Sequence, residues 1–212
     1  MKPDSASPFR LLVEGKDDLH TVIHLLRRHQ IDYDHPRPDY PYIHATEGYA
    51  ELLETMPVSA KTHHKLGVLI DADCDLKQRW SSIKDRLHNV GVNVPAVPPA
   101  TGLVTAGISE DKKIGVWLMP NNVDSGMLED FLAQLVPPGD SRWHHAENAT
   151  TEAKSLGAPF EHGHFAKARI HTWLAWQKEP GQPFGTALTA AYFRHDSEVA
   201  MAFVNWFKRL FF

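Results

Sequence analysis

The sequence predicts an α/β fold in which a compact parallel sheet is flanked by helices, with a helical C-terminal extension. The first observation is a set of uncharged apolar runs, at 11–13, 66–70 and 114–119, of the kind that form strands buried on both faces of a sheet. The second is that apolar residues at helical spacing follow the first two runs after a few residues. Strands that alternate with helices in this way form a largely parallel sheet with right-handed crossovers.

Three strand-and-helix units are expected in the first 91 residues. Their strands are expected at 11–13, 42–45 and 66–70. Their helices carry apolar stripes over 19–26, 49–56 and 76–90. Gly91 follows the third stripe at the position where glycine commonly ends a helix, so the third unit is the most sharply defined.

The next segments complete a domain that we expect to span residues 1–138. Residues 92–107 are rich in Pro, Gly and β-branched side chains, which predicts an extended segment or an edge strand. A further strand is expected at 114–119 and a helix over 127–135. The run Pro137-Pro138-Gly139 stops that helix.

The remaining residues, 139–212, are expected to form a His-rich connector and a helical extension packed on this domain. The polar stretch 140–163 predicts an irregular connector with a short helix through 146–154. Helices are expected over 165–177 and 199–210. The last helix adds an aromatic surface that must pack on the domain or on a partner, such as a second copy of the chain: Phe207, Phe211 and Phe212.

Composition limits the classes of function. Lys and Arg number 22 against 26 Asp and Glu, a formal net charge of -4, so the basic footprint of many nucleic-acid binders is absent and any such contact must be local or bridged by a metal. Cys74 is the single cysteine, which excludes an internal disulfide. The N-terminus lacks the apolar core of a signal peptide, and no apolar run approaches the ~20 residues of a membrane span. We therefore expect a soluble, cytoplasmic protein without membrane contact.

Acidic residues follow two of the expected strands. Glu14 closes the first strand, and Asp71, Asp73 and Asp75 follow the strand at 66–70. Ligands of open α/β sheets bind outside the carboxyl ends of the strands, so Glu14 and Asp71 are expected to converge there. Clustered carboxylates repel unless a hard cation neutralises them, and Mg²⁺ or Mn²⁺ prefers such oxygen ligands.

The individual acids differ in what their positions predict. Asp71 and Asp73 lie two residues apart, so on a strand they share a face, whereas Asp75 is a candidate helix cap. Asp18 follows Glu14 by four residues across a strand-to-helix turn, where it is close enough to help hold a second metal of a phosphoryl-transfer site.

These residues carry a family resemblance. The run Val13-Glu14-Gly15-Lys16-Asp17-Asp18, paired with a later apolar strand that ends in Asp71-Ala72-Asp73, resembles the Toprim domain of topoisomerases, primases, ribosomal-RNA-maturing nucleases and OLD-type nucleases. The strand 114–118, Glu129 and the stretch 167–174 look like a small stand-alone Toprim-like group. The resemblance implies a Mg²⁺-binding triad of Glu14, Asp71 and Asp73, with Asp18 at the second-acid position of OLD-like members. It also implies cleavage or rejoining of nucleic-acid phosphodiesters.

The chain departs from the family pattern in ways that narrow this expectation. Many Toprim sequences have a glycine soon after the aspartate pair, and Cys74-Asp75 stands here instead. A tyrosine-nucleophile domain or a primase zinc ribbon does not fit in the remaining residues, so hydrolysis of DNA or RNA is the expected reaction. Lys167 matches in type the lysine that polarises the scissile phosphate in OLD-type sites, although a surface lysine is the simpler interpretation.

Several alternatives stay open at this point. Glu14 and Asp18 could be a solvated strand-end acid and a helix cap, and Glu129 a first-turn helix acid. The histidines lack a recognised zinc spacing. The rival functions are a non-catalytic or partner-dependent interaction module and a hydrolase of small phosphorylated molecules. The sequence leaves open the choice between DNA and RNA, the oligomeric state and the roles of Asp75, Glu129 and the histidines.

Overall fold

A computed structural model describes residues 5–212, and in that range five strands form one sheet. The strands, in spatial order, are β2 (Tyr42–Ala45), β1 (Phe9–Val13), β3 (Lys65–Asp71), β5 (Lys113–Met119) and β4 (Leu103–Ala106). The first four run parallel and β4 is antiparallel to β5 at the edge. The predicted α/β class is confirmed, as is the edge strand within 92–107.

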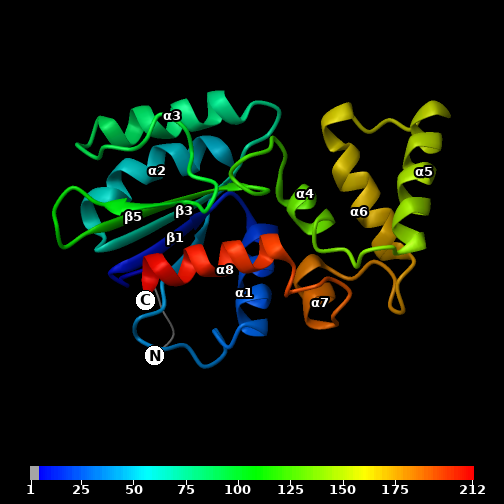
Figure 1. The fold of residues 1–212 in the computed structure, drawn as a ribbon, viewed down its shortest axis with the longest axis horizontal. Coiled ribbons are helices and arrows are strands. Elements are labelled where there is room, and N and C mark those ends of the chain that lie inside the picture. Colours follow the sequence, from blue (N-terminus) through cyan, green and yellow to red (C-terminus); the bar gives the residue numbers. More distant parts are fainter. Residues whose placement is uncertain (1–4) are drawn as a thin grey trace.

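Helices cover both faces of the sheet (Figure 1). On one face lie α2 (Tyr49–Thr62) and α3 (Leu76–His88). On the other lie α1 (Lys16–Arg28) and α8 (Glu198–Phe211). Each face has its own buried cluster, because the side chains of a central strand point alternately to the two faces: Leu12 belongs to the α2 and α3 side, and Leu11 to the α1 and α8 side.

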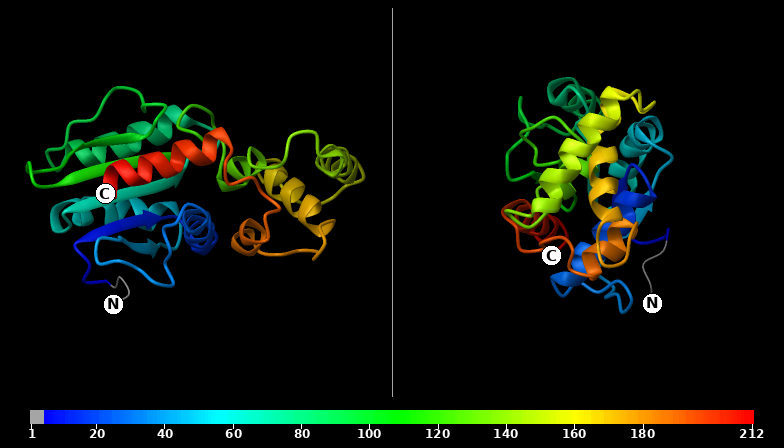
Figure 2. Two further views of the ribbon diagram at one scale, coloured as in Figure 1. Left: turned by 60° about the horizontal axis from the view of Figure 1, so that its bottom comes forward. Right: turned by 90° about the vertical axis from the view of Figure 1, so that its right-hand side faces the viewer.

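The other helices lie beyond the carboxyl ends of the parallel strands, at the right of Figure 1. They are α4 (Leu128–Ala133), α5 (Ser141–Ser155), the 3-10 helix His162–His164, α6 (Phe165–Ala175) and α7 (Phe184–Thr189). Figure 2 shows α5 and α6 side by side in both views, projecting away from the sheet, and α7 packs along α1. This group of helices faces the edge of the sheet where the acidic residues were predicted.

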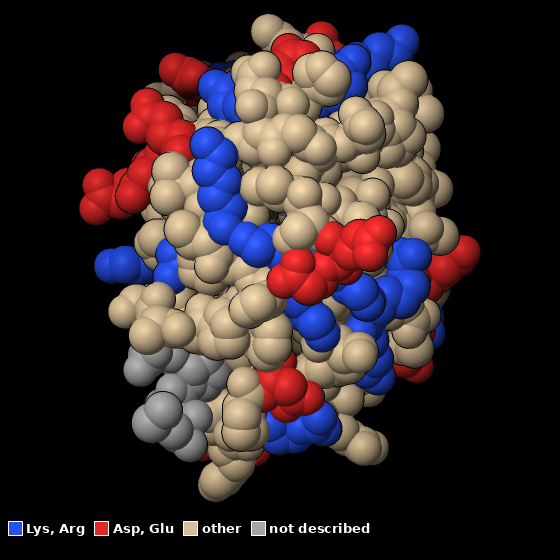
Figure 3. All heavy atoms as spheres, turned by 90° about the vertical axis from the view of Figure 1, so that its left-hand side faces the viewer, with Lys and Arg blue, Asp and Glu red and all other residues tan. Residues whose placement is uncertain are grey.

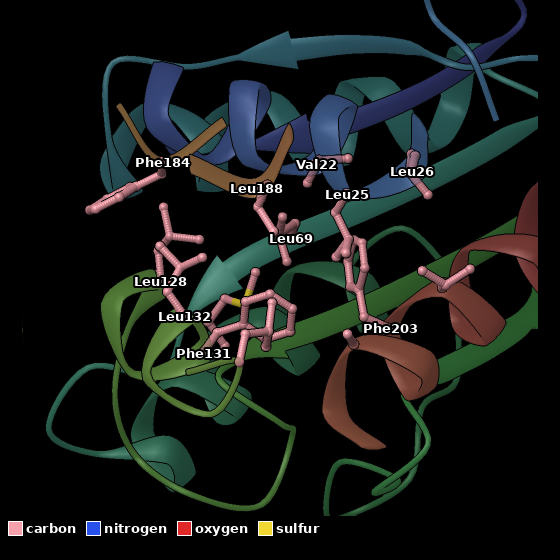
Figure 4. Close-up of a cluster of buried hydrophobic side chains, with 14 of the residues drawn as sticks. Val22, Leu25, Leu26, Leu69, Leu128, Phe131, Leu132, Phe184, Leu188 and Phe203 are labelled. Carbon is pink, nitrogen blue, oxygen red and sulfur yellow. The ribbon is translucent and has the colours of Figure 1, made fainter. Parts of the chain in front are cut away.

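One hydrophobic cluster ties the sheet to these distal helices. Figure 4 shows Leu25 of α1, Leu69 of β3, Phe131 of α4 and Phe203 of α8 directed into a common space, and all four are at most 1% exposed. Phe184 and Leu188 of α7 join the same cluster. The distal helices therefore share their core with the face of the sheet that α1 and α8 cover.

One expectation for the C-terminal part is corrected. The stretch 140–163 is mostly helical instead of an irregular connector, because the short helix expected through 146–154 is part of the longer α5, residues 141–155. Asp140 caps α5 by accepting hydrogen bonds from the backbone N–H groups of Arg142 and Trp143. The helix α7 was not predicted. The aromatic tail packs on the sheet itself, since Phe207 and Phe211 are buried and only Phe212 is exposed.

The contact of α8 with the sheet depends on two glycines. Gly67 of β3 and Gly115 of β5 are register partners, and the side chain of Leu210 lies over both. A Cβ atom at Gly115 would come within 2.6 Å of Leu210 Cδ2 and 3.2 Å of the Leu103 carbonyl oxygen. We therefore expect Gly115→Ala to lower the free energy of unfolding by about 1–3 kcal/mol through overpacking. Urea denaturation measures this, and Gly163→Ala, which enters open space, is the matched control that should unfold like the wild type.

The surface carries both signs of charge at the end opposite the distal helices. Figure 3 shows Lys and Arg interspersed with Asp and Glu there, without one extended basic field on that face. Within residues 5–212, every helix is too short or too polar to span a lipid bilayer.

Candidate functional site at the carboxyl edge of the sheet

Two strand ends place acidic side chains at one edge of the sheet. β1 and β3 are parallel neighbours, with Val13 the register partner of Leu69, so Glu14 and Asp71 follow on the same edge. Next to them is an open pocket of about 310 Å³. Its lining brings together the strand ends, the first turns of α1 and α4, and α6: Glu14, Gly15, Lys16, Asp17, Asp18, Gly48, Asp71, Met127, Leu128, Glu129 and Lys167. We call this the acidic pocket.

Backbone amides fix the two strand-end acids. The N–H of Asp71 donates to Glu14 Oε1 at 2.8 Å, and the N–H of Leu128 donates to Asp71 Oδ1 at 3.0 Å. Leu128 is the first residue of α4, where helical N–H groups have no partner within their own helix. Each carboxylate therefore keeps one oxygen engaged with the backbone, and the predicted convergence of Glu14 and Asp71 is confirmed.

Asp18 reaches the same pocket from the first turn of α1. This helix begins after Gly15, in the tight connection that follows β1, and the Asp18 side chain turns inward, with 8% of the residue exposed. Asp17, its neighbour, is exposed. The adjacent acids thus have different environments, and Asp18 is the one placed among the carboxylates.

Burial and mutual repulsion favour the protonated forms of these acids. Burial, followed by the charges of Glu14 and Glu129, raises the pKa of Asp18 to about 7. Burial, then the charges of Asp18 and Glu14, hold the pKa of Asp71 well above its ordinary value. Burial also raises the pKa of Glu14. The pocket therefore holds acids that repel one another when they ionise, and a bound cation would favour their ionised forms.

Asp73 is placed differently from the expectation. β3 ends at Asp71, so Asp71 and Asp73 do not share a strand face; Asp73 has a φ of 53° and its backbone pairs with Gly126 in both directions, at 2.8 and 2.7 Å. Its side chain pairs with Arg79 of α3 instead of lining the acidic pocket. It remains close enough for its charge to raise the pKa of both Glu14 and Asp71.

Lys167 of α6, a candidate from the sequence, lines the acidic pocket, as does Lys16 of α1. The Nζ of Lys167 lies 3.1 Å from Oε1 of Glu129, a carboxylate that is 4% exposed as a residue. Although partial burial lowers the pKa of Lys167, the charges of Glu129, Asp17 and Asp71 raise it overall. Lys167 is thus a charged lysine at the pocket, and its ion pair with Glu129 orients its ammonium group.

Removing Lys167 should destabilise the protein, because the buried Glu129 carboxylate loses its ion-pair partner. We expect Lys167→Met to lower the free energy of unfolding at pH 7.5 by about 1–2 kcal/mol, which is less than for a fully buried pair because the lysine side chain is half exposed. Chemical denaturation measures the loss. The double variant Lys167→Met with Glu129→Gln should recover most of it, and Lys178→Met, on the exposed surface, should change nothing.

The donors suit a hard cation in type, although they are not yet gathered around one. In the described part of the chain, no three His, Cys, Asp or Glu side chains form a group that could hold a metal ion as they stand. Two acids are turned toward cations of the protein, Asp73 to Arg79 and Glu129 to Lys167. Glu14, Asp18 and Asp71 line the same pocket and offer oxygen atoms of the kind that Mg²⁺ and Mn²⁺ bind.

Comparison with known proteins places the whole site inside one family. A family model described as "Protein of unknown function (DUF3226)" matches residues 8–212. The chain belongs to this family. A search of the curated proteins and a search of the solved structures each found no match. The DUF3226 match takes in every strand of the sheet, the acidic pocket and α8, so the fold and the site lie together in this one family region.

The structure also shows where the residues lie whose roles the sequence left open. Asp75 caps α3, its side chain accepting from the Gln78 N–H at 3.0 Å. The histidines do not line the acidic pocket. Glu129 enters it from α4, although its sequence context is that of an ordinary first-turn acid. The residue that sequence reasoning missed is Arg79, because only the fold shows that it pairs with Asp73 and is buried against α2.

Proposed function

We propose that this protein is a Mg²⁺- or Mn²⁺-dependent phosphodiester hydrolase that acts on DNA or RNA at the acidic pocket. The observation that carries the proposal is the convergence of Glu14, Asp18 and Asp71 at the carboxyl edge of a parallel sheet, where their charges repel. The resemblance to Toprim domains supports the same reaction class.

In this proposal each residue has a defined task. Glu14, Asp18 and Asp71 hold the cation or pair of cations, and Asp73 joins them once its carboxylate leaves Arg79. A bound divalent ion supplies charge neutralisation at the phosphate and an acidified water. The backbone N–H groups of Asp71 and Leu128 keep the two strand-end carboxylates oriented.

Lys167 completes the proposed site. Its ammonium group reaches the acidic pocket from α6, one of the distal helices. The positive charge complements the negative charge of a phosphate in the transition state. Glu129 keeps this ammonium in place before substrate binds. Because the formal net charge of the chain is -4, a nucleic-acid substrate would have to meet the protein locally or through metal-bridged phosphates.

The test is a cleavage assay with four substrates: single-stranded DNA, duplex DNA, RNA and bis-(p-nitrophenyl) phosphate, each with Mg²⁺, Mn²⁺ or EDTA. The proposal expects metal-dependent cleavage of at least one polynucleotide. Turnover of the small diester alone would identify a small-molecule phosphohydrolase. Tight Mn²⁺ binding without turnover of any substrate would identify a non-catalytic module.

A further inference from the structure

A second pocket lies beside the acidic pocket, on the α2 and α3 side of the sheet. It encloses about 450 Å³ and is lined by residues of the β3-to-α3 connection, the first turns of α3 and the start of α2: Tyr49, Ala72, Asp73, Cys74, Asp75, Gln78, Arg79 and Ser82. The two pockets meet along the chain at Gly48-Tyr49 and at Asp71-Ala72. We call this the arginine pocket.

Arg79 is the unusual residue of this pocket. It is 9% exposed, and its guanidinium carbon lies 3.6 Å from the centroid of the Tyr49 ring. A nearly buried guanidinium that stacks on an aromatic face is held in one plane, which suits it to bidentate binding of an oxyanion. The packing thus fixes the orientation of the guanidinium N–H donors of Arg79 before any ligand binds.

The present partner of Arg79 is a replaceable one. Among the described residues, the carboxylate that pairs with Arg79 is that of Asp73, and it contacts Nη2 alone. The Asp73 side chain is 51% exposed, whereas that of Arg79 is 10% exposed. The cation is therefore the fixed member of the pair, and the carboxylate is the member that can rotate away.

The arginine pocket also adjoins the proposed catalytic site. Asp73 follows Asp71 by two residues, and Gly48-Tyr49 and Asp71-Ala72 each place one residue in either pocket. The Asp73 carboxylate therefore lies next to the acidic pocket. An anion that displaced Asp73 from Arg79 would free a carboxylate beside that pocket.

We infer that the arginine pocket binds a phosphate group of the nucleic-acid substrate, with Arg79 as its ligand and Asp73 as an internal occupant that the phosphate displaces. Arg79 is then a positioning residue for the proposed hydrolase, and the inference rests on the proposed function only for the nature of the substrate. Displaced Asp73 becomes available to the acidic pocket, so phosphate and divalent cation bind with positive coupling, and each strengthens the other equally.

The decisive experiment is done first without metal. In EDTA, the affinity for thymidine 5′-monophosphate is measured by calorimetry, and the affinity for a short labelled oligothymidylate by fluorescence anisotropy. We expect Arg79→Gln to weaken binding about tenfold or more, and Asp73→Asn to tighten it about tenfold, because an amide competes poorly with phosphate for a guanidinium. Arg86→Gln removes the same charge from the same helix outside the pocket and should leave binding within about twofold. An effect on the oligonucleotide alone would assign the site to a polynucleotide.

Arg79→Lys covers the case in which Arg79→Gln does not fold. It keeps the charge but loses the planar fork, and we expect it to weaken binding several-fold at an unchanged circular dichroism spectrum. Binding that is equal in the wild type, Arg79→Lys and Asp73→Asn would overturn the inference, as would a lack of binding in all of them.

The second arm repeats the titrations with Mn²⁺. Coupling predicts that the nucleotide tightens Mn²⁺ binding in the wild type and has no such effect in Arg79→Gln. The outcomes separate the two proposals. Arg79-dependent binding of phosphate by a protein that cleaves nothing would keep this site and reject the hydrolase. Metal-dependent cleavage without any Arg79-dependent binding would keep the hydrolase and reject the phosphate site.

Discussion

Asp71→Asn is expected to reduce metal-dependent cleavage by about 10³-fold or more, equivalent to about 4 kcal/mol of transition-state stabilisation. The substitution removes one negative charge from the centre of the acidic pocket and leaves the shape almost unchanged. The asparagine carbonyl can still accept the hydrogen bond from the Leu128 N–H, so the start of α4 stays fixed. Initial rates under saturating Mg²⁺ measure the effect.

Two further measurements separate loss of chemistry from loss of fold. Calorimetric titration with Mn²⁺ should show that Asp71→Asn, and likewise Glu14→Gln, binds the ion much more weakly than the wild type, while circular dichroism stays unchanged. His63→Ala is the silent control, because His63 lies at the C-terminal end of α2, where its ring contacts Ser59 and Thr62. Cleavage at the wild-type rate by Asp71→Asn would reject the proposed site.

Asp18→Asn is expected to stabilise the metal-free protein above pH 7. The pKa of Asp18 is raised to about 7 in the folded state from 3.8 in the unfolded chain, so the folded protein binds this proton more tightly. Stability from this group is therefore complete below about pH 4 and is lost as the pH rises toward 7. For one such carboxyl the loss reaches about 4 kcal/mol at most, and the asparagine variant avoids it.

The measurement is the free energy of unfolding between pH 4.5 and 8.5, with EDTA and then with Mg²⁺. The wild type should lose stability with rising pH in EDTA and regain it when Mg²⁺ is present, whereas Asp18→Asn should show a shallower slope and a smaller response to Mg²⁺. Asp85→Asn, on the exposed surface of α3 and outside both pockets, is the control and should follow the wild type. Equal slopes in all three proteins would mean that Asp18 is already solvated in the fold.

The sheet and the position of Glu14 and Asp71 could be predicted from the local pattern of apolar residues in the sequence. The strands at 66–70 and 114–119 are buried on both faces and therefore read as uninterrupted apolar runs. Because β1 and β3 are parallel, the acids that follow them had to lie at one edge. The convergence of Glu14 and Asp71 was therefore predictable without knowledge of any side-chain contact.

Local pattern failed where distant contacts or unusual backbone decide the structure. The helix α5 presents little apolar periodicity, since Ala146 and Thr150 are its buried residues, and tertiary packing on α6 stabilises it. α7 has six residues, too few for a clear period. The positive φ of Asp73 is set by its pairing with Gly126, and this turns the side chain toward Arg79.

The position of α8 has a consequence for how the protein folds during synthesis. This helix lies over β3, β4 and β5, yet it is translated some 80 residues after the last of those strands, and most of its side chains from Ala200 to Phe211 are buried. Until Phe211 has left the ribosome, the part of this face that α8 covers stays open, with apolar residues such as Leu11 and Trp117 exposed to solvent. We expect a nascent chain that ends before α8 to bind chaperones and to aggregate when released, even though every acidic residue of the site has by then been made.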